Sequence, residues 1–177
     1  GGISTLEDIN CCLNEGCDKV VINSYILKNP EFLRDAIHCF GSQCIIVSVD
    51  YRMDNKGNPV IFSHSGFDDC KFGFFEYIDF INECQAGEII LTNVDKEGWM
   101  NGLDLEILPW AREKLDIPIL LHGGAGSPEH IYDGIQSGAS AVCAGSIFAY
   151  SQYGYRDIKE FLKRKNIPVR LDTESFF

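Results

Sequence analysis

The sequence is poor in basic residues. Its 177 residues contain 15 lysines and arginines against 26 aspartates and glutamates, so the net charge is −11 at neutral pH. Proteins that bind nucleic acids or anionic membranes by electrostatic attraction need an excess of positive charge. The shortage of basic residues therefore argues against both classes of partner, although it leaves room for a local anion-binding site.

Long apolar runs and paired cysteine motifs are also missing. No apolar stretch approaches the length of a membrane-spanning helix, and we expect no secretion signal. The eight cysteines, at positions 11, 12, 17, 39, 44, 70, 84 and 143, form neither a CxxC pair nor a His/Cys metal-ligand spacing. We therefore expect reduced cysteines packed in the core of a cytoplasmic protein, with no metal and no cofactor.

Short apolar runs alternate with helical patterns along the chain. We expect buried strands at residues 18–24, 43–50, 87–95, 117–123 and 140–146. Helical patterns lie at 5–15, 29–40, 74–84, 103–115, 127–138 and 155–165, with Ser4 and Ser127 as caps. Residues 52–69 suggest a small hairpin or flap. The alternation predicts one α/β domain over residues 1–177, with a parallel sheet joined by right-handed crossovers.

Two architectures fit five parallel strands in a chain of this length. One is an open, doubly wound sheet. The other is a (βα)8 barrel, which typically needs about 250 residues, so that roughly its last five strands would be here and its first three βα units absent. An incomplete barrel exposes two sheet edges and an apolar interior, so we expect this chain alone to be inactive.

A repeat favours the barrel. Residues 1–24 align without a gap on residues 123–146, with seven identities that include the glycine turns and Ser24 with Ser146. The identities fall at a glycine turn after one strand and at the serine that ends the next, on the face where barrels build active sites. Glycine turns let backbone N–H groups approach an anion, and a hydroxyl can complete the site. We therefore predict two cradles for a substrate with a phosphate at each end.

Five segments make a family likeness specific: "GGISTLEDI", "FGSQCIIVSVDYR", "GEIILTNVDKEGWMNGLDLE", "PILLHGGAGSPEHI" and "GASAVCAGSIF". Together they resemble the cyclase subunit of imidazole glycerol phosphate synthase, or a close cyclase-like paralogue. The resemblance implies a (βα)8 TIM barrel, entered here after its third strand. It implies a lyase of histidine biosynthesis that closes the ring of imidazole glycerol phosphate from a bisphosphorylated ribulosyl aminoimidazole carboxamide nucleotide. A glutaminase partner subunit would supply the ammonia.

The resemblance also implies roles for residues at the barrel mouth. Asp50 ends the strand at 43–50 and matches a catalytic acid/base carboxylate, whose partner in the family is an aspartate on a strand that this chain does not contain. The positions that match phosphate-binding or substrate-lining residues are Gly2, Asn23, Ser24, Ser65, Gly66, Thr92, Asp95, Gly98, Gly124, Gly145 and Ser146.

Charged residues at the opposite ends of the strands match a second set of family positions. Lys19 and Glu88 match members of a salt-bridge gate through which ammonia enters the barrel, and Asp18 matches a position at the glutaminase interface. From the residues alone, a charge that opens an apolar strand is usually just solvated.

The sequence departs from the family pattern at three places. Glu97-Gly98-Trp99 stands where the family has Asp-Gly-Thr, His122 replaces a small residue, and Gly145 replaces a slightly larger one. These departures keep three alternatives open. The first is a paralogue that serves ammonia transfer in acetamidino-sugar biosynthesis for surface polysaccharides. The others are a phosphosugar isomerase-like barrel without ammonia chemistry and a half-barrel that only binds or assembles.

Overall fold

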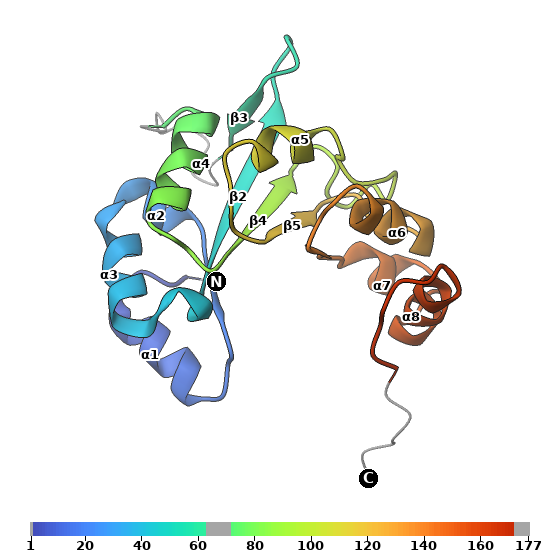
Figure 1. The fold of residues 1–177 in the computed structure, drawn as a ribbon, viewed down its shortest axis with the longest axis horizontal. Helices are drawn as coiled ribbons and strands as arrows, with labels where there is room; N and C mark the ends of the chain where they lie inside the picture. The colour runs from blue at the N-terminus through green and yellow to red at the C-terminus, as the bar shows by residue number, and fades with distance from the viewer. Residues whose placement is uncertain (1, 63–71, 172–177) are drawn as a thin grey trace.

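A six-stranded sheet forms the centre of the computed structural model, which describes residues 2–62 and 72–171 (Figure 1). The strands are β1 (Val20–Ile22), β2 (Ile45–Met53), β3 (Pro59–Ile61), β4 (Glu88–Asn93), β5 (Ile119–His122) and β6 (Ala141–Val142). All five strands expected from the sequence are confirmed. The antiparallel pairing of β3 with β2 confirms a small hairpin in the first part of residues 52–69.

The order of the strands in the sheet follows the chain. β1, β2, β4, β5 and β6 are neighbours in that order, and each of these pairs is parallel. A doubly wound sheet reverses direction at a switch point, whereas a barrel adds each strand to the same side of the last. No reversal occurs in the described part of the chain, so the doubly wound alternative is wrong. The sheet is compatible with the TIM-barrel family.

Helices follow the strands around the sheet. They are α1 (Leu6–Asn14), α2 (Ser24–Lys28), α3 (Glu31–Phe40), α4 (Phe74–Glu83), α5 (Ile107–Arg112), α6 (Pro128–Gln136), α7 (Ser146–Tyr150) and α8 (Tyr155–Arg164), with a 3-10 turn at Ser42–Cys44. Figure 1 shows α1, α3 and α4 along the β1–β2 side of the sheet and α6, α7 and α8 beyond β5. Among the described residues, no helix combines the length and apolarity that a membrane crossing requires.

Two helix starts differ from the sequence expectation. Thr5 rather than Ser4 caps α1, because its side chain accepts a hydrogen bond from the Asp8 N–H while the Asp8 carboxylate accepts one from the Thr5 N–H. Helix α5 begins at Ile107 rather than at Leu103, because the loop before it buries Leu103 and holds Asp104 in hydrogen bonds from Tyr51 and Asn93. The Ser127 cap of α6 is confirmed.

The repeat seen in the sequence recurs in the structure. The bounds of α1 (6–14) and α6 (128–136) differ by 122 residues at both ends, and so do those of α2 (24–28) and α7 (146–150). The turn glycines match as well, since Gly2 and Gly124 have φ values of +84° and +98°. Ser24 and Ser146 begin short helices rather than ending strands, which corrects the sequence expectation. The chain thus builds one local arrangement twice.

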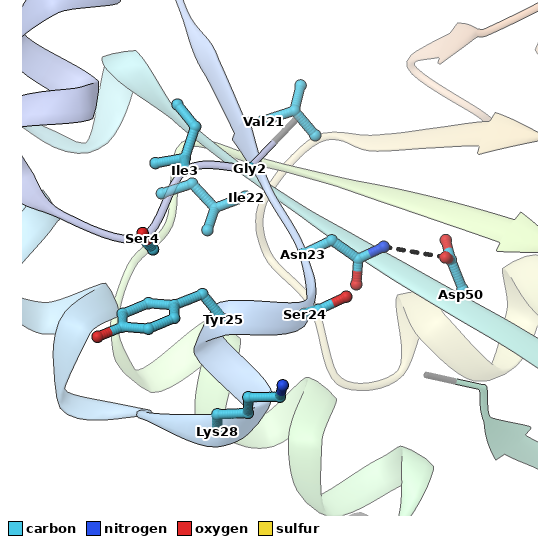
Figure 2. A pocket seen from close by; sticks show the side chains of 10 residues that line it. All are labelled: Gly2, Ile3, Ser4, Val21, Ile22, Asn23, Ser24, Tyr25, Lys28 and Asp50. Atoms are coloured by element: carbon cyan, nitrogen blue, oxygen red, sulfur yellow. Dashed lines mark hydrogen bonds between the residues drawn. The ribbon is translucent and has the colours of Figure 1, made fainter. Parts of the chain in front are cut away.

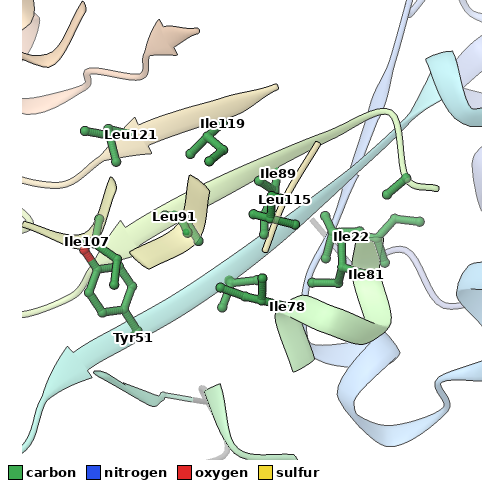
Figure 3. Packing of buried hydrophobic residues seen from close by; sticks show 14 of the residues in the cluster. Ile22, Tyr51, Ile78, Ile81, Ile89, Leu91, Ile107, Leu115, Ile119 and Leu121 are labelled. Carbon is green, nitrogen blue, oxygen red and sulfur yellow. The ribbon is translucent and has the colours of Figure 1, made fainter. Parts of the chain in front are cut away.

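The two faces of the sheet are buried to different degrees. Side chains on one face pack under the helices and are at most 4% exposed; they are Val20, Ile22, Ile45, Val47, Val49, Tyr51, Ile89, Leu91, Ile119 and Leu121. Figure 3 shows this layer against Ile78 and Ile81 of α4 and Ile107 of α5. The alternate residues point to the other face, where Val21 is 44% exposed and Asp50, Glu88 and His122 are half-buried. The second face therefore carries the polar groups.

The cysteines only partly match the sequence expectation. Cys84 is buried, but Cys11, Cys17 and Cys39 are exposed on or beside α1 and α3, so the expectation that all of them lie in the core is wrong. The amphipathic pattern of α1 and α3 places the Cys11 and Cys39 thiols on the outward side, and Cys17 lies in the exposed segment between α1 and β1. Cys70 lies outside the described residues.

Val47→Ala should lower the free energy of unfolding by about 2 kcal/mol, because it removes two buried methyl groups and leaves a cavity. Val21→Ala on the neighbouring strand is the matched control and, measured in the 177-residue chain, should change stability by less than about 0.5 kcal/mol. Urea denaturation followed by circular dichroism measures both. Equal losses for the two variants would contradict the assignment of the two faces.

Candidate active site

Three polar side chains form a row at the carboxyl ends of the central strands. The strand register pairs Asp50 with Thr92 and Thr92 with His122. Because directly paired residues of parallel strands point to the same face, all three side chains lie on the partly open face of the sheet. The row brings a carboxylate, a hydroxyl and an imidazole to one edge of the sheet.

Asp50 lies in a pocket with the first predicted phosphate site. The pocket has a volume of about 460 Å³, and its lining includes Gly2, Asn23, Ser24, Lys28 and Asp50 (Figure 2). The Asn23 side-chain N–H donates to Asp50 Oδ2 at 2.9 Å, which fixes the carboxylate beside the β1–α2 turn. The structure therefore brings together four residues that the sequence predicted. Sequence reasoning missed Lys28, whose only signal was its position four residues after Ser24.

The second predicted phosphate site lies at the ends of β5 and β6. Gly123 and Gly124 both have positive φ values, +93° and +98°. A Cβ on Gly124 would collide with the carbonyl oxygen of Gly102, whose N–H donates to the Gly124 carbonyl at 2.8 Å. The glycines are needed because the β4–α5 and β5–α6 loops meet backbone to backbone. Gly98 lies in the first of these loops.

Gly145 and Ser146 begin the element that follows β6. Gly145 caps α7 and Ser146 is its first residue, at the place that Asn23 and Ser24 occupy in α2. A Cβ on Gly145 would meet nothing within 4 Å, so this glycine is not required by packing. The position can therefore hold the larger residue that the family usually has there.

The loop after β4 carries the remaining mouth residues. Asp95 faces Arg52 at 3.9 Å, and the Arg52 guanidinium also lies over the Phe62 ring. Trp99 is 74% exposed, so the indole points toward solvent and does not fill the pocket around Asp50. The predicted residues Ser65 and Gly66 lie outside the described residues.

A buried polar network supports this edge of the sheet and was not predicted. The Tyr51 hydroxyl and the Asn93 side-chain N–H both donate to Asp104 Oδ2, at 3.0 and 2.7 Å. Burial, reinforced by the Asp104 charge, raises the pKa of Tyr51 far above its usual range, so the hydroxyl stays protonated and keeps donating. Asn93 Oδ1 also accepts from the Asp95 N–H. The network ties the end of β2, next to Asp50, to the loop after β4.

Charged residues also meet at the opposite end of the sheet. Lys19 and Glu88 form an ion pair across β2, and both side chains lie on the partly open face. Asp18 beside them is exposed. The predicted gate residues are thus in contact. In the described part of the chain, no group of three or more His, Cys, Asp or Glu side chains could hold a metal ion.

Comparison with known proteins identifies the family. The model of a family described as "Histidine biosynthesis protein" matches residues 1–154. The chain belongs to the histidine biosynthesis protein family. It is also 40% identical over 178 residues to the "Imidazole glycerol phosphate synthase subunit HisF" of Lachnoclostridium phytofermentans, an alignment that covers 99% of this chain and 69% of the relative. These findings confirm the family resemblance that the sequence motifs indicated.

Tyr51→Phe should lower the free energy of unfolding by about 1–3 kcal/mol, because it leaves the buried Asp104 carboxylate with one hydrogen-bond donor fewer. Tyr155→Phe is the matched control, since Tyr155 is 69% exposed and its loss should not be measurable. Urea denaturation compares the two variants. A Tyr51→Phe protein as stable as the control would show that the network does not hold the two strands together.

Proposed function

We propose that this protein is the cyclase subunit of imidazole glycerol phosphate synthase. The substrate would be a bisphosphorylated ribulosyl aminoimidazole carboxamide nucleotide, which reacts with ammonia to give imidazole glycerol phosphate and aminoimidazole carboxamide ribotide. The observation that carries the proposal is the position of Asp50 in one pocket with Gly2, Asn23 and Ser24. The 40% identity to a protein named as this subunit supports it.

Asp50 is the acid/base residue of the proposed reaction. Asn23 occupies Oδ2, and the second carboxylate oxygen makes no hydrogen bond to the described residues, so it can face substrate. In ring closure the carboxylate would accept a proton from the attacking nitrogen and return one to the departing nitrogen. In the family likeness, the acid/base partner of Asp50 is an aspartate on a strand that residues 1–177 do not include.

The two repeated turns bind the two phosphates in this proposal. Gly2, Asn23 and Ser24 hold one phosphate, and the Lys28 ammonium in the same pocket supplies a positive charge. Gly124, Gly145 and Ser146 hold the other, with Gly98 in the adjoining loop. Thr92 and Asp95 line the mouth between the two cradles. Ser65 and Gly66 belong to the same proposal through the family likeness alone.

Ammonia enters from the opposite end of the barrel in this proposal. Lys19 and Glu88 would form part of the gate, and the exposed Asp18 would contact a glutaminase partner. The two ends of the parallel strands are then used for different tasks, with ammonia delivered at one end and consumed at the other. Ammonia then does not have to pass through the mouth that the bisphosphate occupies.

We also propose that the described sheet is part of one closed (βα)8 domain. In the described residues β1 pairs only with β2 and β6 only with β5, so two sheet edges remain to be joined. The relative is longer than this chain, which spans 69% of it, and three further βα units would fit that difference. The 177 residues alone would then be inactive. The seven free thiols among the described residues fit a cytoplasmic protein.

Asp50→Asn in the native protein should lower kcat by about 100-fold or more while the Kd for the bisphosphate stays unchanged, because the variant keeps shape but loses the titrating group. Asp35→Asn, on the exposed side of α3, is the control and should retain full turnover. The assay supplies ammonia and follows both products. Unchanged turnover of Asp50→Asn would reject the assigned role. A wild-type protein that forms no product would reject the function and favour the acetamidino-sugar branch.

Glu88→Gln should lower glutamine-dependent turnover several-fold and leave turnover with free ammonia unchanged, because the ion pair with Lys19 acts on ammonia passage and not on ring closure. Asp79→Asn breaks another pair, that with Lys114, and serves as the control. Parallel assays with glutaminase plus glutamine and with ammonium salt give the ratio. A ratio equal to that of the control would contradict the gate.

A further inference from the structure

His122 is a mouth residue that the proposed reaction does not yet use. It is the last residue of β5, and its register partner Thr92 is in turn paired with Asp50. The imidazole is half-buried and lies on the same face of the sheet as the Asp50 carboxylate. Strand β4 lies between β2 and β5, so the backbones at Asp50 and His122 are two strand spacings apart, a distance of about 9–10 Å. His122 therefore lies across the mouth from Asp50 and not in contact with it.

One ring nitrogen of His122 is held and the other is available. Nδ1 lies 3.3 Å from Thr92 Oγ1, so the neighbouring strand fixes the ring. The Nε2 atom is on the far side of the ring from Thr92 and makes no hydrogen bond to residues 2–62 or 72–171. A fixed ring with a free donor or acceptor nitrogen is suited to contact a ligand.

The groups around His122 favour an anion. The next two residues are the positive-φ glycines of the second predicted cradle. From the β4–α5 loop, the Lys96 side chain approaches Gly124, and its ammonium donates to the Leu103 carbonyl. Toward β6, Cys143 follows the strand and its N–H donates to the Leu121 carbonyl; burial, with a smaller effect of Glu88, raises the pKa of this thiol and keeps it neutral.

We propose that His122 binds the substrate phosphate of the Gly123–Gly124 cradle, donating to it from Nε2 while Thr92 orients the ring. The identity of this substrate rests on the proposed function. The contact would make His122 a specificity-determining residue for a phosphate monoester. A charged imidazolium binds such an anion more tightly than a neutral side chain does, because the hydrogen bond becomes charge-assisted.

The test compares the binding of the bisphosphate substrate to wild-type protein, His122→Gln and the control His38→Gln, which alters an exposed histidine in α3. Calorimetry without ammonia or glutamine gives Kd without turnover, and circular dichroism verifies the fold. His122→Gln should bind about tenfold more weakly or worse at pH 6, and His38→Gln should bind like wild type.

The outcomes separate this proposal from the proposed function. Equal Kd values for wild type and His122→Gln, in a protein that turns over the bisphosphate, overturn the role of His122 and leave the function intact. A variant that loses kcat with unchanged Kd also overturns it, because His122 would then act in proton transfer. If the bisphosphate does not bind but ribose 5-phosphate does, and His122→Gln weakens that binding at pH 6, the phosphate contact holds and the function fails.

Discussion

The burial of one face of the sheet under helices is the constraint on which the rest of the molecule depends. Because β1, β2, β4, β5 and β6 are parallel, their carboxyl ends meet at one edge of the sheet, and crossovers of the usual right hand collect the helices on one side. In β2 this makes Val47, Val49 and Tyr51 packing residues with at most 1% exposure, while Asp50 turns to the other side. The position of the catalytic candidate is thus a consequence of core packing, with period two along the strand.

The buried Asp104 carboxylate extends this constraint from the core to the mouth. Asp104 lies in the loop after β4 and contacts the face of the sheet that packs under the helices. Its two hydrogen-bond donors, Tyr51 and Asn93, come from the neighbouring strands β2 and β4. A half-satisfied network at this depth would be costly, so the geometry of the strand ends is defined sharply. Thr92 and Asp50 are the residues immediately before Asn93 and Tyr51. The positions of Asp50 and Thr92 are therefore fixed by the hydrogen bonds of Tyr51 and Asn93, whose side chains point away from the site.

Much of the fold could be predicted from the sequence, because continuous apolar runs and repeated turn glycines are local signals. The five strands, the positive-φ turn at Gly2 and the contact between Lys19 and Glu88 followed from such signals, the last with the help of the family likeness. Helices α2 and α7 were missed, since five-residue helices carry no periodicity and depend on tertiary packing. The Tyr51–Asn93–Asp104 network was missed because its members are distant in sequence and each looks ordinary alone.

The hydrogen bond between the Gly102 N–H and the Gly124 carbonyl has a consequence for the motions of the mouth. It joins the β4–α5 loop to the β5–α6 loop, with no side chain between the two backbones. Neither loop can open without breaking this bond, so the two behave as one cooperative opening unit. Hydrogen exchange at the single amide of Gly102 would then report the opening of the whole β4–β5 side of the mouth.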